Sequence, residues 1–533
     1  MPPATPANGI LSDQWMTRLR WLIAAAFAGL FAYYVAMTWH WAIVADEAAM
    51  HYVVLLIRHG KIPYREITDM NMPGTYLAEQ TAMAIFGWGD ISWRLYEFLL
   101  LAFMTASATV IAGPRRWIGA IYGSLFFILM HASEGPHVSV EREELMAVLL
   151  VAAVAALVLS VRKRLPLLAL PLGLMAAFAA SIKPTAVLVD VGLLALLGIA
   201  LHRQRIPLRN YLLWAIAGNV AVFALVLGYL AHYQAIGSFV FVLRKVLPLY
   251  AGVTPHPIGF MLQNLIPTGL LPLLLCGIAA AALRKERMGF AQWALLIGAA
   301  FGALSYFLQG KGYLHHRYSF VVFLMLWVGI ELADAITRID KPSRLIGAFG
   351  LLAIFLYAVP HYVRAVDRNA KRMQRIDNVA ITPGLELTTL LDRDLSNLGV
   401  DRLQGRVVCL DLLNSCLNGL YRLRLVENTS FTGDMLLFSR TDGPLVSYYR
   451  DRFMQTQQTD PADVVVLGNE WFMNGKPGFE KLDTWPLYKA YLFANYDRVI
   501  ERRVSQDPDA PAYQLFLRKG SPLLADVQAH PLH

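Results

Sequence analysis

Long apolar runs separated by short polar segments make up the first two thirds of the chain. A transmembrane helix needs about 20 predominantly apolar residues. Runs of this kind, three of them short, lie at 21–41, 93–113, 117–131, 144–161, 165–181, 185–201, 210–231, 262–283, 289–308, 318–336 and 345–362. The pattern therefore predicts a polytopic α-helical membrane protein with about eleven transmembrane helices.

One apolar region, 165–200, is too long for a single crossing. It is interrupted by Ser181-Ile182-Lys183-Pro184, and proline cannot continue a helical hydrogen-bond ladder. We therefore expect a turn between two short helices at this point.

The last third of the chain has a different pattern. Short strand-like runs at 406–413, 463–467 and 513–517 alternate with amphipathic stretches at 384–398 and 445–456. Strands that alternate with helices are typical of a small α/β domain. We predict a membrane module over residues 1–364, with amphipathic helices in its loop 42–92, and a soluble α/β domain over 365–533.

Composition supports this division. Hydrophobic residues make up 56% of the chain and charged residues only 16%, against about 25% charged in soluble proteins, which argues against a water-soluble enzyme. The net charge is +9, and it belongs to the first 364 residues, which hold 27 basic and 17 acidic side chains; the remainder holds 20 and 21. A basic excess confined to loops between apolar runs indicates membrane topology and no nucleic-acid partner.

The basic clusters orient the chain. Six of them alternate with loops that are poorer in basic residues: Arg18/Arg20, Arg115/Arg116, Arg162/Lys163/Arg164, Arg203/Arg205/Arg209, Arg284/Lys285/Arg287 and Arg338/Lys341/Arg344. With eleven spans all six fall on one side, which the positive-inside rule makes cytoplasmic. Loops 42–92, 132–143, 232–261 and 309–317 are then extracytoplasmic, as is the C-terminal domain.

Carboxylates follow the first span directly. Asp46 and Glu47 begin the first outer loop, which continues to Asp69. Asp46 fits an N-cap of a helix spanning roughly 47–58, a purely structural role. The functional alternative is a carboxylate at the membrane surface that takes a proton from an acceptor hydroxyl.

The second outer loop ends in Glu141, Arg142, Glu143 and Glu144. Acidic residues in a first helical turn stabilise the helix dipole, which is a sufficient structural role for the last two. Arg142 is unusual on an outer face. Lys183, between two apolar helices, needs a partner, and Asp190 is one candidate.

The last short outer loop holds Lys311, His315, His316 and Arg317 on the side that is otherwise poor in basic residues. Snorkelling to the interface accounts for one or two such side chains. Four together favour an anion, and lysine and arginine are the usual phosphate ligands. A metal is a lesser alternative, because adjacent histidines rarely bind one ion, so we predict no metal site and no cofactor, with a divalent cation as the minor possibility.

These loops together indicate group transfer from a phosphate. A carboxylate activates the acceptor while cations stabilise the developing phosphate charge. The sequence contains no Walker A motif and no G-x-G-x-x-G motif after a strand, so no nucleotide site is indicated. A membrane chain can instead take an energised donor from the bilayer as a lipid-linked phosphate.

Several motifs resemble those of the GT-C glycosyltransferases, in particular the bacterial protein O-mannosyltransferase and aminoarabinose-transferase branch. The motifs are Asp46-Glu47, Gly60-x-x-Pro63-Tyr64, Asp69-x-x-x-Pro73, Glu141-Arg142-Glu143, Ser181-Ile182-Lys183-Pro184 and Gln309-Gly310-Lys311-Gly312-Tyr313-x-x-His316. The resemblance covers about residues 20–335. Two features depart from the family pattern: a single Pro73 stands where relatives have a proline pair, and the C-terminal domain matches no family tail.

The resemblance implies inverting transfer of a sugar from a polyprenyl-phosphate donor to a lipid, glycan or protein acceptor, outside the bacterial inner membrane. It implies that Asp46 is the catalytic base. Donor and acceptor would be positioned by Glu47, Asp69, Glu141, Arg142 and Glu143. The phosphate would be held by Lys183, Lys311, His316 and Arg317.

Other functions were weighed. A transporter or lipid flippase is the main alternative, although such proteins usually show related halves and charges near the bilayer midplane. A membrane-anchored binding protein is a weaker one, because eleven spans exceed what an anchor needs. Cys409 and Cys416 either pair in an oxidising compartment or remain buried thiols.

Overall fold

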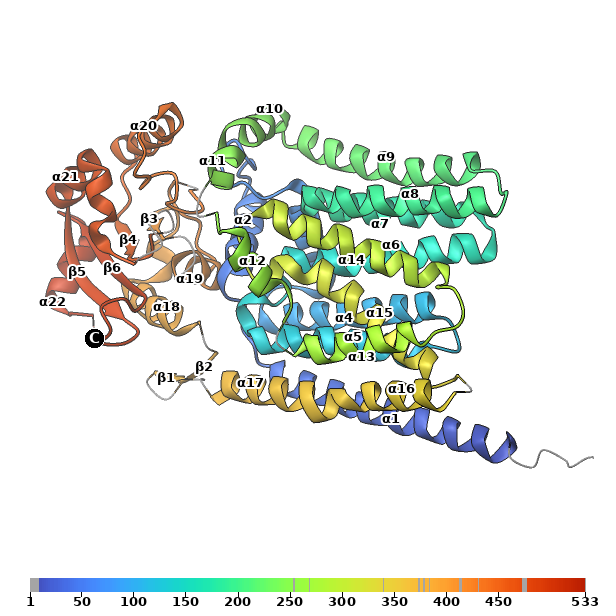
Figure 1. Ribbon diagram of the computed structural model, residues 1–533. Coiled ribbons are helices and arrows are strands. Elements are labelled where there is room, and N and C mark those ends of the chain that lie inside the picture. The colour runs from blue at the N-terminus through green and yellow to red at the C-terminus, as the bar shows by residue number, and fades with distance from the viewer. Residues whose placement is uncertain are drawn as a thin grey trace, which may run out of the picture.

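The protein is described by a computed structural model that covers residues 9–532 except 253–254, 268, 339, 372–373, 377–378, 383, 412–414, 430 and 472–476. Long, nearly parallel helices form a bundle, and a sheet-containing region lies against one end of it (Figure 1). Every one of the predicted apolar runs is helical. The helices are α1 (Gly9–Thr38), α4 (Asp90–Ala112), α5 (Trp117–Glu134), α6 (Arg142–Lys163), α7 (Ala169–Ile182), α8 (Val187–Arg203), α9 (Arg209–His232), α12 (Ile258–Leu265), α13 (Leu270–Ala282), α14 (Phe290–Gln309), α15 (Tyr318–Ala335), α16 (Lys341–Ala353) and α17 (Val359–Lys371).

Their lengths agree with a multi-pass membrane protein. Within the described residues, eight helical segments are long and apolar enough to cross a membrane, and α12 with α13, bent by 72° at a short break, makes a ninth. The remaining two predicted spans, α5 and α7, are helices of 18 and 14 residues. At 1.5 Å per residue α7 is only about 21 Å long. A 3₁₀ turn at Pro166–Leu168 extends it, and it lies between α6 and α9.

The predicted turn between the two short helices is confirmed. Helix α7 ends at Ile182, a 3₁₀ turn spans Pro184–Ala186, and α8 begins at Val187. Lys183 has an extended backbone, with φ −141° and ψ 112°. A proline disfavours helical geometry in the residue before it, so Pro184 itself determines where α7 stops.

The loop after α1 forms two further helices, α2 (Ala45–Arg58) and α3 (Pro73–Phe86). They lie at the end of the bundle next to the sheet-containing region, as do the short helices α10 (Ile236–Phe241) and α11 (Leu247–Gly252) (Figure 1). The N-cap interpretation of Asp46 is wrong. The helix begins two residues earlier than predicted, at Ala45, with Val44 as its N-cap, and Asp46 lies inside the first turn with its carboxylate directed elsewhere.

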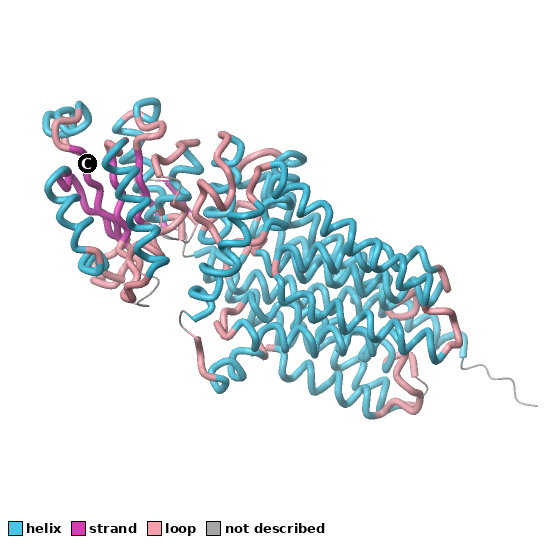
Figure 2. The backbone as a smooth tube through the Cα atoms, turned by 90° about the horizontal axis from the view of Figure 1, so that it is seen from above, coloured by secondary structure: helices cyan, strands magenta, loops and turns pink. Residues whose placement is uncertain are grey.

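The C-terminal region is built on a four-stranded sheet of order β3-β4-β6-β5, whose strands are labelled in Figure 1 and drawn in magenta in Figure 2. Strands β3 (Val407–Leu410) and β4 (Val464–Gly468) are parallel, whereas β6 (Ala512–Arg518) is antiparallel to both β4 and β5 (Tyr496–Arg503). Helices α18 (Glu386–Leu398), α19 (Cys416–Leu423), α20 (Pro444–Thr459), α21 (Pro486–Asn495) and α22 (Pro522–Ala529) surround it, and a hairpin of β1 (Gln374–Ile376) and β2 (Val379–Ile381) precedes it.

This region confirms the α/β expectation. The three predicted strand runs coincide with β3, β4 and β6, although residues 412 and 413 of the first run lie outside the described residues. The two amphipathic stretches are α18 and α20. Helix α17 spans Val359–Lys371 and therefore crosses the predicted boundary at residue 364. The division into two domains stays a prediction.

Hydrogen bonds attach the C-terminal region to the loop between α1 and α4. The Asn418 amide donates to the carbonyl of Ile43 at 3.0 Å, the backbone N–H of Glu427 donates to the Tyr52 hydroxyl at 2.8 Å, and Arg452 donates to the carbonyl of Glu66 at 3.0 Å. The region is therefore anchored on the loop that contains Asp46.

A disulfide joins Cys409 to Cys416, with the two Cα atoms 5.8 Å apart. It links the end of β3 to the first turn of α19, the helix that packs on α2. The question that the sequence left open is thus answered in favour of pairing.

Candidate active site

The centre of the site is an ion pair between two helix starts. Asp46 lies in the first turn of α2 and Arg142 in the first turn of α6, and the Arg142 Nη2 is 2.9 Å from the Asp46 Oδ2. The backbone is left-handed beside both residues: Ala45, directly before Asp46, has φ 56°, and Val140, two residues before Arg142, has φ 58°. Left-handed backbone is costly for residues with a side chain, above all for a branched one, and such strain clusters at functional sites.

A second contact holds Arg142 in place. Its guanidinium also donates to the side-chain oxygen of Asn71. Asn71 in turn donates to Asp69 through its backbone N–H at 2.8 Å and its amide at 3.1 Å, and the Tyr76 hydroxyl donates to the same carboxylate. Burial raises the pKa of Asp69. Asp69 thus orients Asn71, which fixes the arginine that faces Asp46.

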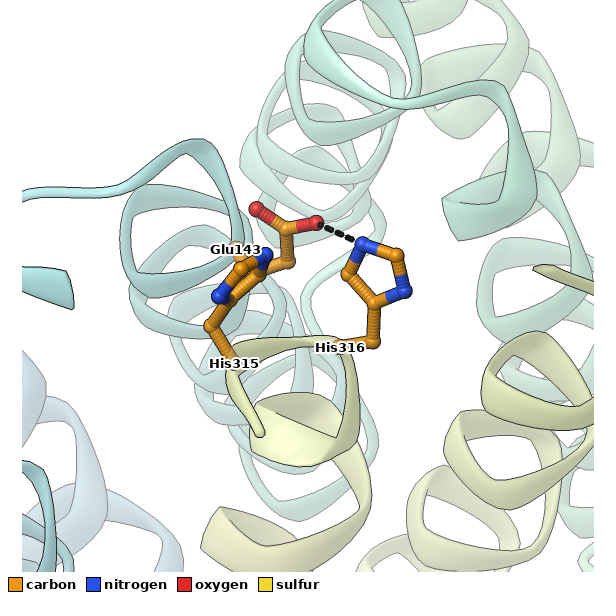
Figure 3. Close-up of side chains that lie close together, drawn as sticks. All are labelled: Glu143, His315 and His316. Atoms are coloured by element: carbon orange, nitrogen blue, oxygen red, sulfur yellow. Dashed lines mark ion pairs between the residues drawn. The ribbon is translucent and has the colours of Figure 1, made fainter. Parts of the chain in front are cut away.

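A second group forms around Glu143, one residue further along α6. The Lys183 ammonium makes an ion pair with its carboxylate, and the His316 Nε2 is 3.2 Å from the same oxygen. His315 and His316 approach Glu143 from the same short segment (Figure 3). That segment is a short 3₁₀ helix, His315–Arg317, directly before α15.

The carboxylates differ sharply in exposure. The Asp46 side chain is 31% exposed, whereas those of Glu141 and Glu143 are 2% and 0% exposed. Burial, and then the nearby charge of Asp46, raises the pKa of Glu141 to about 8. Asp46 is therefore the member of this group that an acceptor from solvent can reach, while Glu141 is protonated at neutral pH.

Two predicted phosphate ligands are engaged elsewhere. Lys311 donates to the backbone carbonyl of Tyr250 at 3.0 Å. Arg317 pairs with Glu134 at 2.8 Å, and the Tyr318 hydroxyl donates to the other oxygen of Glu134 at 2.7 Å. Of the four cationic candidates, the structure brings Lys183 and His316 together at Glu143 and directs Lys311 and Arg317 to other partners.

The last predicted positioning residue, Glu47, belongs to a separate buried group. It lies with His51 and Glu79 between α2 and α3. Burial raises the pKa values of both glutamates and lowers that of His51 to about 3.

Three features of the site differ from expectation. Lys183 pairs with Glu143 and not with Asp190, because the turn at Pro184 directs the lysine toward the start of α6. His315 lies at the Glu143 site together with His316, a place that the sequence did not predict for it. Asn71 was missed, although its place two residues after Asp69 suits a side chain that hydrogen-bonds a nearby aspartate.

This arrangement can perform a displacement at a phosphate-linked carbon. A reachable carboxylate, Asp46, is held in orientation by the partly buried Arg142, and a lysine and a histidine lie at the neighbouring residue of α6. A base of this kind accepts a proton from an attacking hydroxyl, and cationic groups stabilise charge that develops on a leaving phosphate.

Of three comparisons with known proteins, the comparison with solved structures finds similar folds. No family model matches the sequence, and no curated protein matches it. Among solved structures, the chain is similar to ArnT from Cupriavidus metallidurans in the apo state, with a TM-score of 0.52 and 13% identity over 95% of this chain and 98% of that one. The same protein bound to undecaprenyl phosphate gives a TM-score of 0.51 and 13% identity, covering 94% and 98%.

Archaeal oligosaccharyltransferase AglB from Archaeoglobus fulgidus also matches, at a TM-score of 0.49 and 11% identity over 94% of this chain and 74% of that one, a likeness too low to support an inference. The ArnT matches extend over nearly the whole of both chains, the C-terminal region included. The fold resembles that of ArnT.

Proposed function

We propose that the protein is a glycosyltransferase that moves a sugar from a polyprenyl-phosphate donor to a hydroxyl of a cell-envelope lipid, glycan or protein. The observation that carries the proposal is the pairing of an accessible carboxylate with Arg142 beside the Lys183–Glu143–His316 group. The GT-C fold supports it, and one of the similar ArnT structures is bound to undecaprenyl phosphate.

In the proposed reaction Asp46 takes the proton of the acceptor hydroxyl. The acceptor oxygen forms a bond to the anomeric carbon as the bond from that carbon to the phosphate oxygen breaks. The sugar is transferred with inversion, and the electron pair leaves with the polyprenyl phosphate. Lys183 and His316 stabilise the charge that develops on the phosphate, whereas Lys311 and Arg317 stay with Tyr250 and Glu134 and take no part in this scheme.

Arg142 has a positioning part in this scheme. It touches Asp46 and Asn71 and holds the base at the start of α2. Asp69 orients Asn71, and Glu141, protonated at neutral pH, adds no negative charge beside Asp46. Glu143 fixes Lys183 and His316, and Glu47 lies behind Asp46 on the same turn of α2.

We further propose that the protein resides in a bacterial inner membrane with its C-terminal domain, residues 365–533, outside. The basic clusters predict this orientation, and the paired cysteines support it, because disulfides persist in oxidising compartments. The C-terminal domain covers the loop of Asp46 and is a suitable surface for an acceptor. A transporter is less well supported, because Asp46, Glu143, Lys183 and His316 gather at one end of the bundle.

The test is a transfer assay with purified protein and a panel of polyprenyl-phosphate sugars. Loss of a general base typically costs 10²- to 10⁴-fold, so Asp46→Asn should lower turnover by about that much. The asparagine keeps an oxygen that accepts from Arg142, so the variant should remain folded. Asp401→Asn, on the exposed surface of the C-terminal region, is the matched control and should transfer normally. Equal turnover in the wild type and Asp46→Asn would contradict the proposal.

A further inference from the structure

Three buried side chains meet between α2 and α3, behind the proposed catalytic base. Glu47 and His51 lie one turn apart on the same face of α2, and Glu79 faces them from α3. The His51 Nδ1 is 3.4 Å from the Glu79 Oε2 and 4.0 Å from the Glu47 Oε2. The three residues are 2%, 1% and 6% exposed, so the group is shielded from solvent.

The carboxylates of this group lack hydrogen-bond partners. Both Glu47 oxygens and the Glu79 Oε2 are buried and accept no hydrogen bond. Over the part of the chain that the structure describes, no lysine or arginine side chain lies within ion-pair distance of either glutamate, and His51 is the one basic group that does. Even a protonated His51 would balance only one of the two carboxylates, and buried charges are normally paired or bind a metal.

Two other clusters of glutamate and histidine differ in this respect. Glu143, with His315 and His316, already has the Lys183 ammonium. Glu97, with His131 and Glu144, has the Arg94 guanidinium, and it also accepts from Ser139 and Tyr34. Each of these clusters therefore has a lysine or arginine side chain at its carboxylate, whereas the Glu47 cluster does not.

We propose that Glu47, His51 and Glu79 bind a divalent first-row metal ion, with Zn²⁺ as the best fit. Imidazole nitrogen and carboxylate oxygen are common zinc ligands at about 2.0–2.2 Å. Tetrahedral ligands at that distance lie about 3.4 Å from one another, which is the His51–Glu79 separation. The Glu47 Oε2 is 4.0 Å from the His51 Nδ1, so it must move about 0.6 Å closer to the imidazole to complete this geometry. Ligation through Nδ1 replaces its contact with the carbonyl of Glu47.

The surroundings hold the imidazole in the required place. The Trp93 and Tyr421 rings pack edge-on against His51, with centroids 4.1 and 5.3 Å away. A metal here would join α2 to α3 directly behind Asp46, and Tyr421 belongs to α19, which the Cys409–Cys416 disulfide holds. The ion would therefore fix the position of the helix turn that contains the base without touching the reacting atoms.

Metal content tests the proposal on the full-length purified protein. The wild type is incubated with Zn²⁺, freed of unbound ion and measured by mass spectrometry. It should keep about one zinc per chain. Glu79→Gln and His51→Gln should each lower that content at least tenfold. His315→Asn, which alters the other histidine cluster, should retain it.

Stability gives a second, independent reading. Chelation should lower the thermal unfolding midpoint of the wild type and leave that of Glu79→Gln unchanged, and the His51→Gln variant serves if the first does not fold. Two outcomes would overturn the proposal. One is a wild type that retains no zinc; protonation, and not a metal, would then neutralise the two buried carboxylates. The other is zinc that survives in Glu79→Gln and His51→Gln but is lost in His315→Asn.

Discussion

Removal of the Lys183 ammonium is expected to destabilise the protein through the carboxylate that it leaves behind. The Glu143 side chain is 0% exposed and the Lys183 side chain 18% exposed. Removal of one partner of a buried ion pair lowers the free energy of unfolding by about 3–5 kcal/mol, because the other partner remains as an uncompensated buried charge. The partial exposure of the lysine lets water approach, so we expect about 3 kcal/mol for Lys183→Met.

That loss translates into a measurable shift. Unfolding entropy is about 2 cal/mol/K per residue, or about 1.1 kcal/mol/K for this chain if it unfolds as one unit, so 3 kcal/mol lowers the midpoint by about 3 °C. Glu143→Gln in the same molecule removes the stranded charge and should restore at least half of the stability. The assay is thermal unfolding in one detergent. Lys489→Met is the matched control, because its pair with Asp483 is exposed on both sides and such pairs contribute at most about 1 kcal/mol.

The double variant provides the decisive comparison. If Glu143→Gln fails to improve the unfolding midpoint of Lys183→Met, the lost lysine acts through something other than the buried carboxylate. If Lys183→Met is as stable as Lys489→Met, the carboxylate does not need a cation. Either result would refute the electrostatic account of the Glu143 group.

Two further predictions concern pH and the disulfide. Burial and the Asp46 charge raise the pKa of Glu141 to about 8, so Glu141 is neutral at pH 7 and becomes a second negative charge beside Asp46 as the pH rises. Wild-type transfer should therefore fall above about pH 8, whereas Glu141→Gln should transfer at the wild-type rate at neutral pH and show no alkaline decline. An unchanged decline in this variant would exclude Glu141 as the source. The Cys409–Cys416 bridge spans seven positions, and loss of such a cross-link costs about 2.5 kcal/mol by chain entropy, so the double serine variant should unfold at a lower temperature than the wild type. In intact cells both cysteines should resist alkylation until a reductant is added. Alkylation without a reductant would indicate that the C-terminal domain faces the cytoplasm.

Hydrophobic periodicity and local chemistry were sufficient to predict most of the elements. Within the described residues the apolar runs fold into helices, one of them bent by 72° between α12 and α13. Pro184 ends α7 because it disfavours helical geometry in Lys183, and the alternating runs of the last third form β3, β4 and β6. These outcomes depend on residues close together in the chain. They can therefore be predicted from the sequence alone. The sequence also shows that Arg142 is unusual, because it lies in a loop on the side of the membrane that is predicted to be poor in basic residues.

The partners of the charged side chains were decided by the tertiary structure. Sequence proximity suggested Asp190 for Lys183 and a capping role for Asp46, but the packing of α6 against α7 brings Glu143 to Lys183, and the start of α2 meets Arg142 from 96 positions away. Likewise, His315 and His316 meet Glu143 because the segment before α15 packs against α6. Which residues ionise, and which ion pairs form, depends on burial and on distances between elements, and neither quantity is a property of local sequence.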